Sequence, residues 1–165
     1  MSAPAAVSDT RAVSAPPLRL DAAQREVLHE EAAALAATLR DAEARERYSV
    51  LVDAIEAGEV EGDLLAALEG LLEMLLQTGR ARRVHGADGE QSLLRLFHQT
   101  PRGAAARRAT ESVNEALRQL RGQTLESILL TVQGPGVYRL GLATETCRLT
   151  VEIDRHGLSV ESLEV

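Results

Sequence analysis

Residues 128–142, ILLTVQGPGVYRLGL, decide the fold of this chain. Apolar side chains recur at every second position on both sides of the central Gly-Pro-Gly, and this is the period of a half-buried β-strand rather than of a helix. Glycine and proline at the centre favour a tight turn, because glycine adopts backbone conformations closed to other residues and proline fixes φ. The stretch therefore predicts an antiparallel hairpin with one apolar face, formed by Ile128, Leu130, Val132, Tyr138, Leu140 and Leu142.

Two more alternating runs follow the hairpin. Leu149, Val151 and Ile153 alternate with polar and charged residues, and Leu158 and Val160 form a fourth short run. The connections QGPG, ATETC and DRHG are short, so consecutive strands pair antiparallel. We predict a four-stranded antiparallel β-meander over residues 122–165, with an apolar face that needs a cover.

The preceding part of the chain, residues 20–121, has the 3.6-residue period of helices instead. Asp21 is a candidate N-cap, and Gly58, Gly79 and Gly122 interrupt the apolar stripes where helices would end. The fold class is therefore α+β, with an N-terminal helical region of about four to five helices followed by the C-terminal meander. We expect the meander, residues 122–165, to pack on the helices.

Residues 1–19 lack this periodicity and contain three of the five prolines. Burial of so few apolar side chains does not offset the entropy lost on ordering them. We expect a disordered tail there.

A leucine-rich stretch, residues 64–76, predicts a helix that is apolar over more than half of its circumference. Such a helix is either central in the core or shared between subunits. We expect it to form an oligomer interface through Leu65, Leu68, Leu72 and Leu76.

Charge is sorted along the chain. All 18 basic residues are arginines, and the net charge is −7. Residues 21–79 carry 14 acidic residues and 4 arginines, whereas residues 80–121 carry 9 arginines and 4 acidic residues. This polarity suggests binding to an anion or to a second copy of the chain.

The arginine-rich segment supplies the candidate binding site. One loop is expected over residues 80–89, and a second arginine group lies around a Pro-Arg-Gly turn and the helix start that follows it. Guanidinium groups pair bidentately with phosphate or carboxylate, so two such loops meeting in space would bind an anion. The alternative is a solvated surface or one paired between subunits. The candidate anion- or partner-binding residues are Arg80, Arg82, Arg83, His85, Arg102, Arg107 and Arg108.

Other chemistries lack their usual residues. The four histidines are far apart and in no metal-ligand spacing, and Cys147 is the single cysteine. There is no lysine for a phosphate-binding loop and no serine in a nucleophile elbow. We expect no catalytic residues, no metal and no cofactor.

The amino-acid composition indicates the kind of organism and the cellular compartment. The absence of lysine with abundant alanine, leucine, arginine and glycine is typical of a GC-rich bacterial genome. The most apolar run, residues 64–76, is interrupted by Glu69 and Glu73 and is too short to span a bilayer, and no secretory signal is recognisable. We expect a cytoplasmic protein that does not contact a membrane.

Three functions remain open. The first is a non-enzymatic interaction, assembly or adaptor protein that binds a protein partner or a second copy of itself as a homo-oligomer. The second is a nucleic-acid-associated regulator that uses the arginine-rich segment 80–121, although the net negative charge and scarce aromatic residues disfavour it. The third is a small-anion-binding sensor or enzyme. The sequence favours the first.

Overall fold

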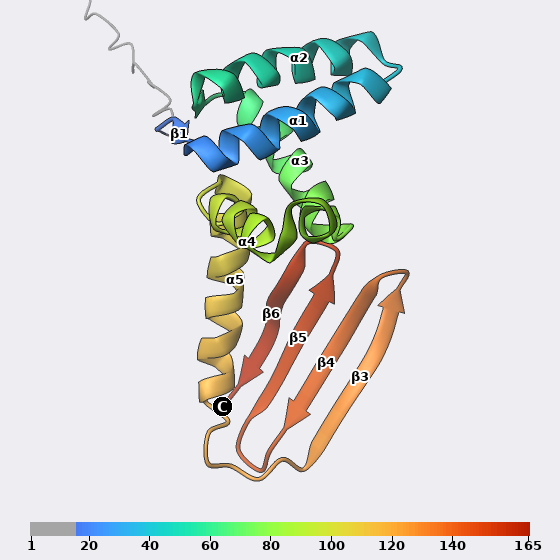
Figure 1. Cartoon of the computed structure of the whole chain (residues 1–165). Coiled ribbons are helices and arrows are strands. Elements are labelled where there is room, and N and C mark those ends of the chain that lie inside the picture. The colour runs from blue at the N-terminus through green and yellow to red at the C-terminus, as the bar shows by residue number, and fades with distance from the viewer. Residues whose placement is uncertain (1–15) are drawn as a thin grey trace, which may run out of the picture. The chain divides into compact units, whose positions relative to one another are not determined.

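The computed structural model describes residues 16–165 and has five helices followed by a four-stranded antiparallel sheet (Figure 1). The predicted α+β class with a C-terminal meander is confirmed. The chain divides into two compact units at Leu94 and Arg95. This division lies inside a helix, whereas the sequence suggested a boundary between residues 121 and 122.

Unit 1 is helical apart from a two-stranded ribbon. Most of the expected tail, residues 1–15, lies outside the described residues, but Leu18 and Leu20 are buried. The elements are β1 (Leu18–Arg19), α1 (Ala22–Thr38), α2 (Ala42–Ala57), β2 (Glu59–Val60), α3 (Leu64–Gln77) and the larger part of α4 (Arg80–Phe97).

Local signals set the helix ends of this unit. The Asp21 carboxylate accepts from the Gln24 backbone N–H at 2.8 Å, and the Gln24 side chain accepts from the Asp21 N–H, which completes a capping box. Gly58 ends α2 with φ of 86°, a left-handed conformation that favours glycine. Next to it, β1 pairs antiparallel with β2, and Leu18 lies opposite Val60.

The segment expected as a loop over residues 80–89 is helical. Gly86, with φ of 73° and ψ of −176°, interrupts the helical conformation, and α4 continues on both sides of it. The sequence prediction of a loop was wrong because glycine here produces a kink between two helical turns rather than an end.

Unit 2 contains the end of α4, α5 (Pro101–Arg118) and the sheet. The strands are β3 (Ser127–Gly134), β4 (Val137–Ala143), β5 (Arg148–Asp154) and β6 (Gly157–Glu164), in that spatial order. Leu130 lies opposite Leu140, Leu140 opposite Val151, and Val151 opposite Val160. Since directly opposed residues share a face, the predicted apolar residues of all four strands lie on one side of the sheet.

The sequence Thr-Pro-Arg-Gly forms the corner before α5. The Thr100 hydroxyl donates to the Phe97 carbonyl at 2.8 Å and accepts from the Gly103 N–H at 3.2 Å, and Pro101 occupies the first turn. A Cβ atom at Gly103 would lie 1.9 Å from the Phe97 carbonyl oxygen. Glycine is required because the two chain segments approach so closely.

Helix α5 covers part of the apolar face. Val113 and Ala116 are buried against Leu149 and Val151 of β5. Around them pack side chains of β4, β5, β6 and the end of the helical segment, namely Leu120, Leu140, Leu142, Ile153, Leu158 and Val160. Figure 1 shows α5 beside β6, with β3 at the opposite edge of the sheet.

Gly103→Ala should destabilise the protein by about 1 to 3 kcal/mol, because the added methyl group forces the chain apart at the corner. The control is Gly70→Ala in α3, where the new Cβ would lie 3.8 Å from the Tyr48 hydroxyl, an ordinary contact. Alanine should stabilise that helix by up to about 1 kcal/mol. Urea unfolding followed by circular dichroism measures both, and equal effects would contradict the close approach at Gly103.

Candidate functional site

Two members of the predicted arginine cluster contact one buried carboxylate. Arg80 Nε donates to Glu31 Oε2 at 2.7 Å, and His85 Nε2 lies 3.0 Å from Glu31 Oε1. The Glu31 side chain is 3% exposed and that of His85 is 11% exposed. An ionised carboxylate only accepts, so His85 Nε2 carries the proton of this hydrogen bond. These two contacts connect the first turns of α4 with α1.

Electrostatics favour the ionised carboxylate in this network. Burial raises the pKa of Glu31, but hydrogen bonds from Arg80 and His85 outweigh it, and the pKa lies below the ordinary value of 4.5. The same hydrogen bond raises the pKa of Arg80. The Arg80 guanidinium and the His85 imidazole are therefore matched with an anion of their own unit.

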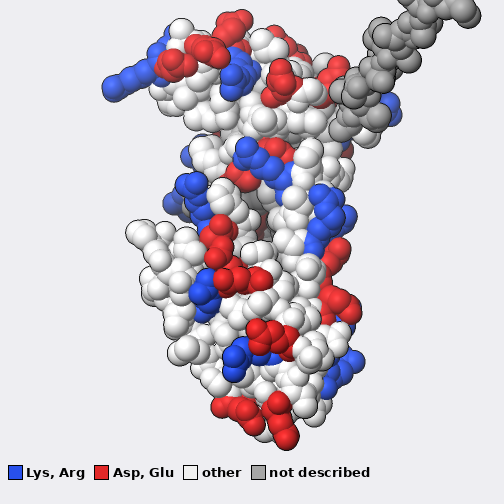
Figure 2. Space-filling model, turned by 180° about the vertical axis from the view of Figure 1, so that it is seen from behind, with Lys and Arg blue, Asp and Glu red and all other residues white. Residues whose placement is uncertain are grey.

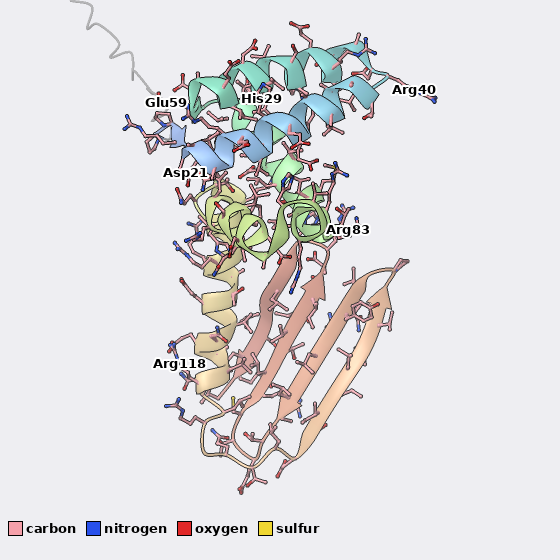
Figure 3. The ribbon with its side chains drawn as sticks, in the orientation of Figure 1. Asp21, His29, Arg40, Glu59, Arg83 and Arg118 are labelled. Atoms are coloured by element: carbon pink, nitrogen blue, oxygen red, sulfur yellow. The ribbon has the colours of Figure 1, made fainter. Side chains whose placement is uncertain are left out.

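The other arginines of the cluster lie on exposed helix surfaces. Arg82 Nη1 is 3.8 Å from Glu90, and Arg83 donates to the Thr78 carbonyl at 3.3 Å. In α5, Arg107 Nε is 3.7 Å from Glu111, and Arg102 and Arg108 are exposed. Figure 3 shows Arg83 on α4 and places Arg118 on the side of α5 turned away from the sheet.

The structure thus brings together only some of the predicted anion- or partner-binding residues. Arg80 and His85 meet at Glu31, whereas Arg82 and Arg83 contact other groups of the same unit. The arginines at residues 102–108 belong to unit 2. Sequence reasoning missed Glu31, because nothing in a run of helical glutamates distinguishes the one that becomes buried.

The leucines expected at an oligomer interface form the core of unit 1. Leu68 and Leu72 are fully buried, Leu65 is 9% exposed, and Leu76 is half-buried. Their burial accounts for the wide apolar stripe of α3 without a second copy of the chain. This removes the reason for assigning Leu65, Leu68, Leu72 and Leu76 to a contact between subunits.

Residues 16–165, the part of the chain that the structure describes, contain neither a metal-binding cluster nor a membrane-spanning helix. No group of three or more histidine, cysteine, aspartate or glutamate side chains in this range is placed to hold a metal ion. No helix in the same range has the length and apolar character needed to cross a membrane.

The most unusual surface lies on the sheet. On the apolar face, the half formed by β5 and β6 lies under α5, whereas Ile128, Leu130 and Val132 of β3 are 64%, 61% and 71% exposed. Tyr138 of β4, opposite Val132, is 41% exposed. We call these four residues the open half of the sheet.

The flank of α5 extends this apolar surface. One flank of α5 faces β6, and there Ser112, Glu115 and Gln119 line a shallow groove with Val160 and Leu163. At 100° per residue, Leu117 points to the opposite flank of the helix, and it is 37% exposed. The exposed apolar surface therefore consists of the open half of the sheet and, beside it, the flank of α5 around Leu117.

The two edges of the sheet differ in charge. Strand β3, the turn after it and the first two residues of β4, which together are residues 127–138, contain no charged residue. Strand β6 carries Glu161 and Glu164, and its pairing with β5 shifts register at Glu161, which forms an ion pair with Arg139. Charges protect an edge from association. Strand β6 has this protection, whereas the only irregularity of β3 is a register shift at Gln133, beside the turn. Figure 2 shows the β3 margin, on the left, without red or blue atoms.

The sequence contained a signal for this surface. A chain that is 26% charged has an uncharged stretch at residues 127–138, and Ile128, Leu129 and Leu130 break strict alternation with three consecutive apolar residues. The periodicity identified the apolar face, but it could not show how much of that face α5 covers.

Comparisons with known protein families, curated proteins and solved structures found no match to this chain.

Glu31→Gln should destabilise unit 1 by about 1 to 3 kcal/mol, since it leaves Arg80 and His85 without their carboxylate. A carboxyl group with a lowered folded-state pKa stabilises the protein fully above its ordinary pKa of 4.5, and the contribution disappears as the pH falls through the lower folded-state value. Urea unfolding from pH 7 to pH 3 should therefore show a smaller loss of stability in Glu31→Gln than in the wild type. The adjacent exposed variant Glu30→Gln should follow the wild type.

Proposed function

We propose that the protein is a non-enzymatic interaction and assembly protein whose contact surface is the open half of the sheet together with the flank of α5 around Leu117. The observation that carries the proposal is the exposure of Ile128, Leu130, Val132 and Tyr138 on an apolar face that is otherwise covered. A contiguous exposed apolar surface of this kind is typical of a protein–protein contact.

Energetics support this assignment. Burying a whole leucine or isoleucine side chain is worth about 1.5 to 3 kcal/mol, so covering these largely exposed residues would contribute several kcal/mol to association. The absence of charge in residues 127–138 lowers the desolvation cost, because no ionised group has to leave water. Association would therefore gain free energy from apolar burial and lose little from desolvation of charged groups. This balance favours a protein partner over a small molecule.

The arginine-rich segment offers less support for the alternatives. Arg80 and His85 are matched with Glu31, and Arg82, Arg107 and Arg118 each lie beside a glutamate. A nucleic acid or small anion would compete with these carboxylates for the same guanidinium groups. Binding to either remains a prediction from the sequence.

A tagged bait tests the surface. Immobilised wild-type protein should retain a specific protein from an extract, either its own untagged copy or another chain, and Leu130→Glu should reduce retention at least tenfold because it places a charge in the contact.

Leu129→Glu is the matched control for this experiment. Leu129 has the same side chain and nearly the same exposure, 60% against 61%, but it lies on the opposite face of β3. It should leave retention close to the wild type. Equal loss with both variants, or no loss with either, would contradict a contact through the open half of the sheet.

A further inference from the structure

We infer that the occupant of the open half is a second copy of this chain, with the two sheets stacked face to face. This inference rests on the proposed function and adds the identity of the partner and its geometry. On a single face of the sheet, α5 lies over β5 and β6, whereas Ile128, Leu130 and Val132 of β3 are largely exposed.

The space beside α5 suits a second sheet. Sheets that pack face to face lie about 10 Å apart, and a helix with its side chains is about 10 to 12 Å across. A sheet placed over the open half would therefore form one layer with α5, side by side with it. Because α5 occupies the layer above β5 and β6, the second sheet must be centred over β3 and β4.

A second sheet centred over β3 and β4 is compatible with a symmetric dimer. A two-fold axis parallel to the strands, between the two sheets and near β3 and β4, places the partner's β3 over β4 and the partner's α5 beyond the edge of β3. Each β3 edge then lies against the flank of the other copy's α5, where Leu117 is exposed. One rotation covers both open halves and both β3 edges.

The charge pattern favours this occupant. A helix from an unrelated protein would cover the face but would not explain why the β3 edge also lacks charge. In the stacked dimer both the face and the edge of β3 become buried, and neither brings an ionised group into the contact. Side-by-side pairing of two β3 edges is a poorer solution, because it joins the two open halves into a larger exposed apolar surface.

The association is tested first by mass. Sedimentation velocity of the full-length chain at micromolar concentration should give a dimer, Leu130→Glu should weaken dimerisation at least tenfold, and Leu129→Glu should remain a dimer. Circular dichroism of the three proteins verifies that the variants are folded. A folded wild-type monomer at 100 μM, about a hundred times above a micromolar dissociation constant, would overturn the inference.

Cross-linking then distinguishes stacking from edge pairing. Leu130→Cys places two thiols across the stacked interface within reach of a short bismaleimide, whereas Leu129→Cys places them on opposite outer faces of the two sheets. We expect a covalent dimer with Leu130→Cys and none with Leu129→Cys. The unsubstituted chain, whose single cysteine Cys147 is buried, gives the background. Efficient dimers from Leu129→Cys would overturn stacking and indicate pairing of the β3 edges.

Failure of the inference and failure of the proposed function give different results. A monomeric wild-type chain whose bait still retains another protein, with loss only in Leu130→Glu, overturns the second copy as occupant and leaves the contact surface in place. A wild-type monomer whose bait shows no difference between Leu130→Glu and Leu129→Glu contradicts both.

Discussion

One helix is too narrow to cover a four-stranded sheet, and this constraint governs the C-terminal unit. A helix is about 10 to 12 Å across, and neighbouring strands lie about 4.8 Å apart, so one helix covers little more than two strands. Helix α5 lies beside β6 and buries Leu149 and Val151 (Figure 1). The period-two pattern nevertheless places apolar residues on the same face of all four strands. Half of that face consequently has no cover from α5.

The remaining features of the sheet agree with a contact at its uncovered side. Glu161, at a bulge of β6, pairs with Arg139, so charge is concentrated on one edge strand and absent from the other. Such protection is expected where association must be prevented. The arginines of residues 80–121 instead make contacts within their own units. Arg80 binds the buried Glu31, and Arg107 and Arg118 lie beside glutamates on the exposed surface of α5. These arginines therefore have partners within the fold, whereas β3 is uncharged and its apolar face is largely exposed.

Local features of the structure were accessible from the sequence, whereas long-range contacts were not. Alternation in residues 128–160 predicted the meander, and Asp21 and Gly58 marked helix ends, because these signals depend on neighbouring residues alone. The loop expected at residues 80–89 is a kinked helix, since Gly86 is compatible with either structure. Glu31 lies 49 and 54 residues from Arg80 and His85, and no spacing rule connects them. How far α5 extends over the sheet likewise depends on packing, so the open half became visible only in the structure.

Hydrogen exchange of the β3 amides as a function of protein concentration measures whether this strand is covered by another chain. A free edge strand exposes every second backbone N–H to water, whereas an edge packed against another chain exchanges slowly. In a dimer stacked through the open half, peptides covering residues 127–134 should exchange more slowly at 100 μM than at 0.1 μM, about a thousandfold range that brackets a micromolar dissociation constant. Peptides of β6 should not change. Concentration-independent exchange in β3 would contradict an assembly through this strand.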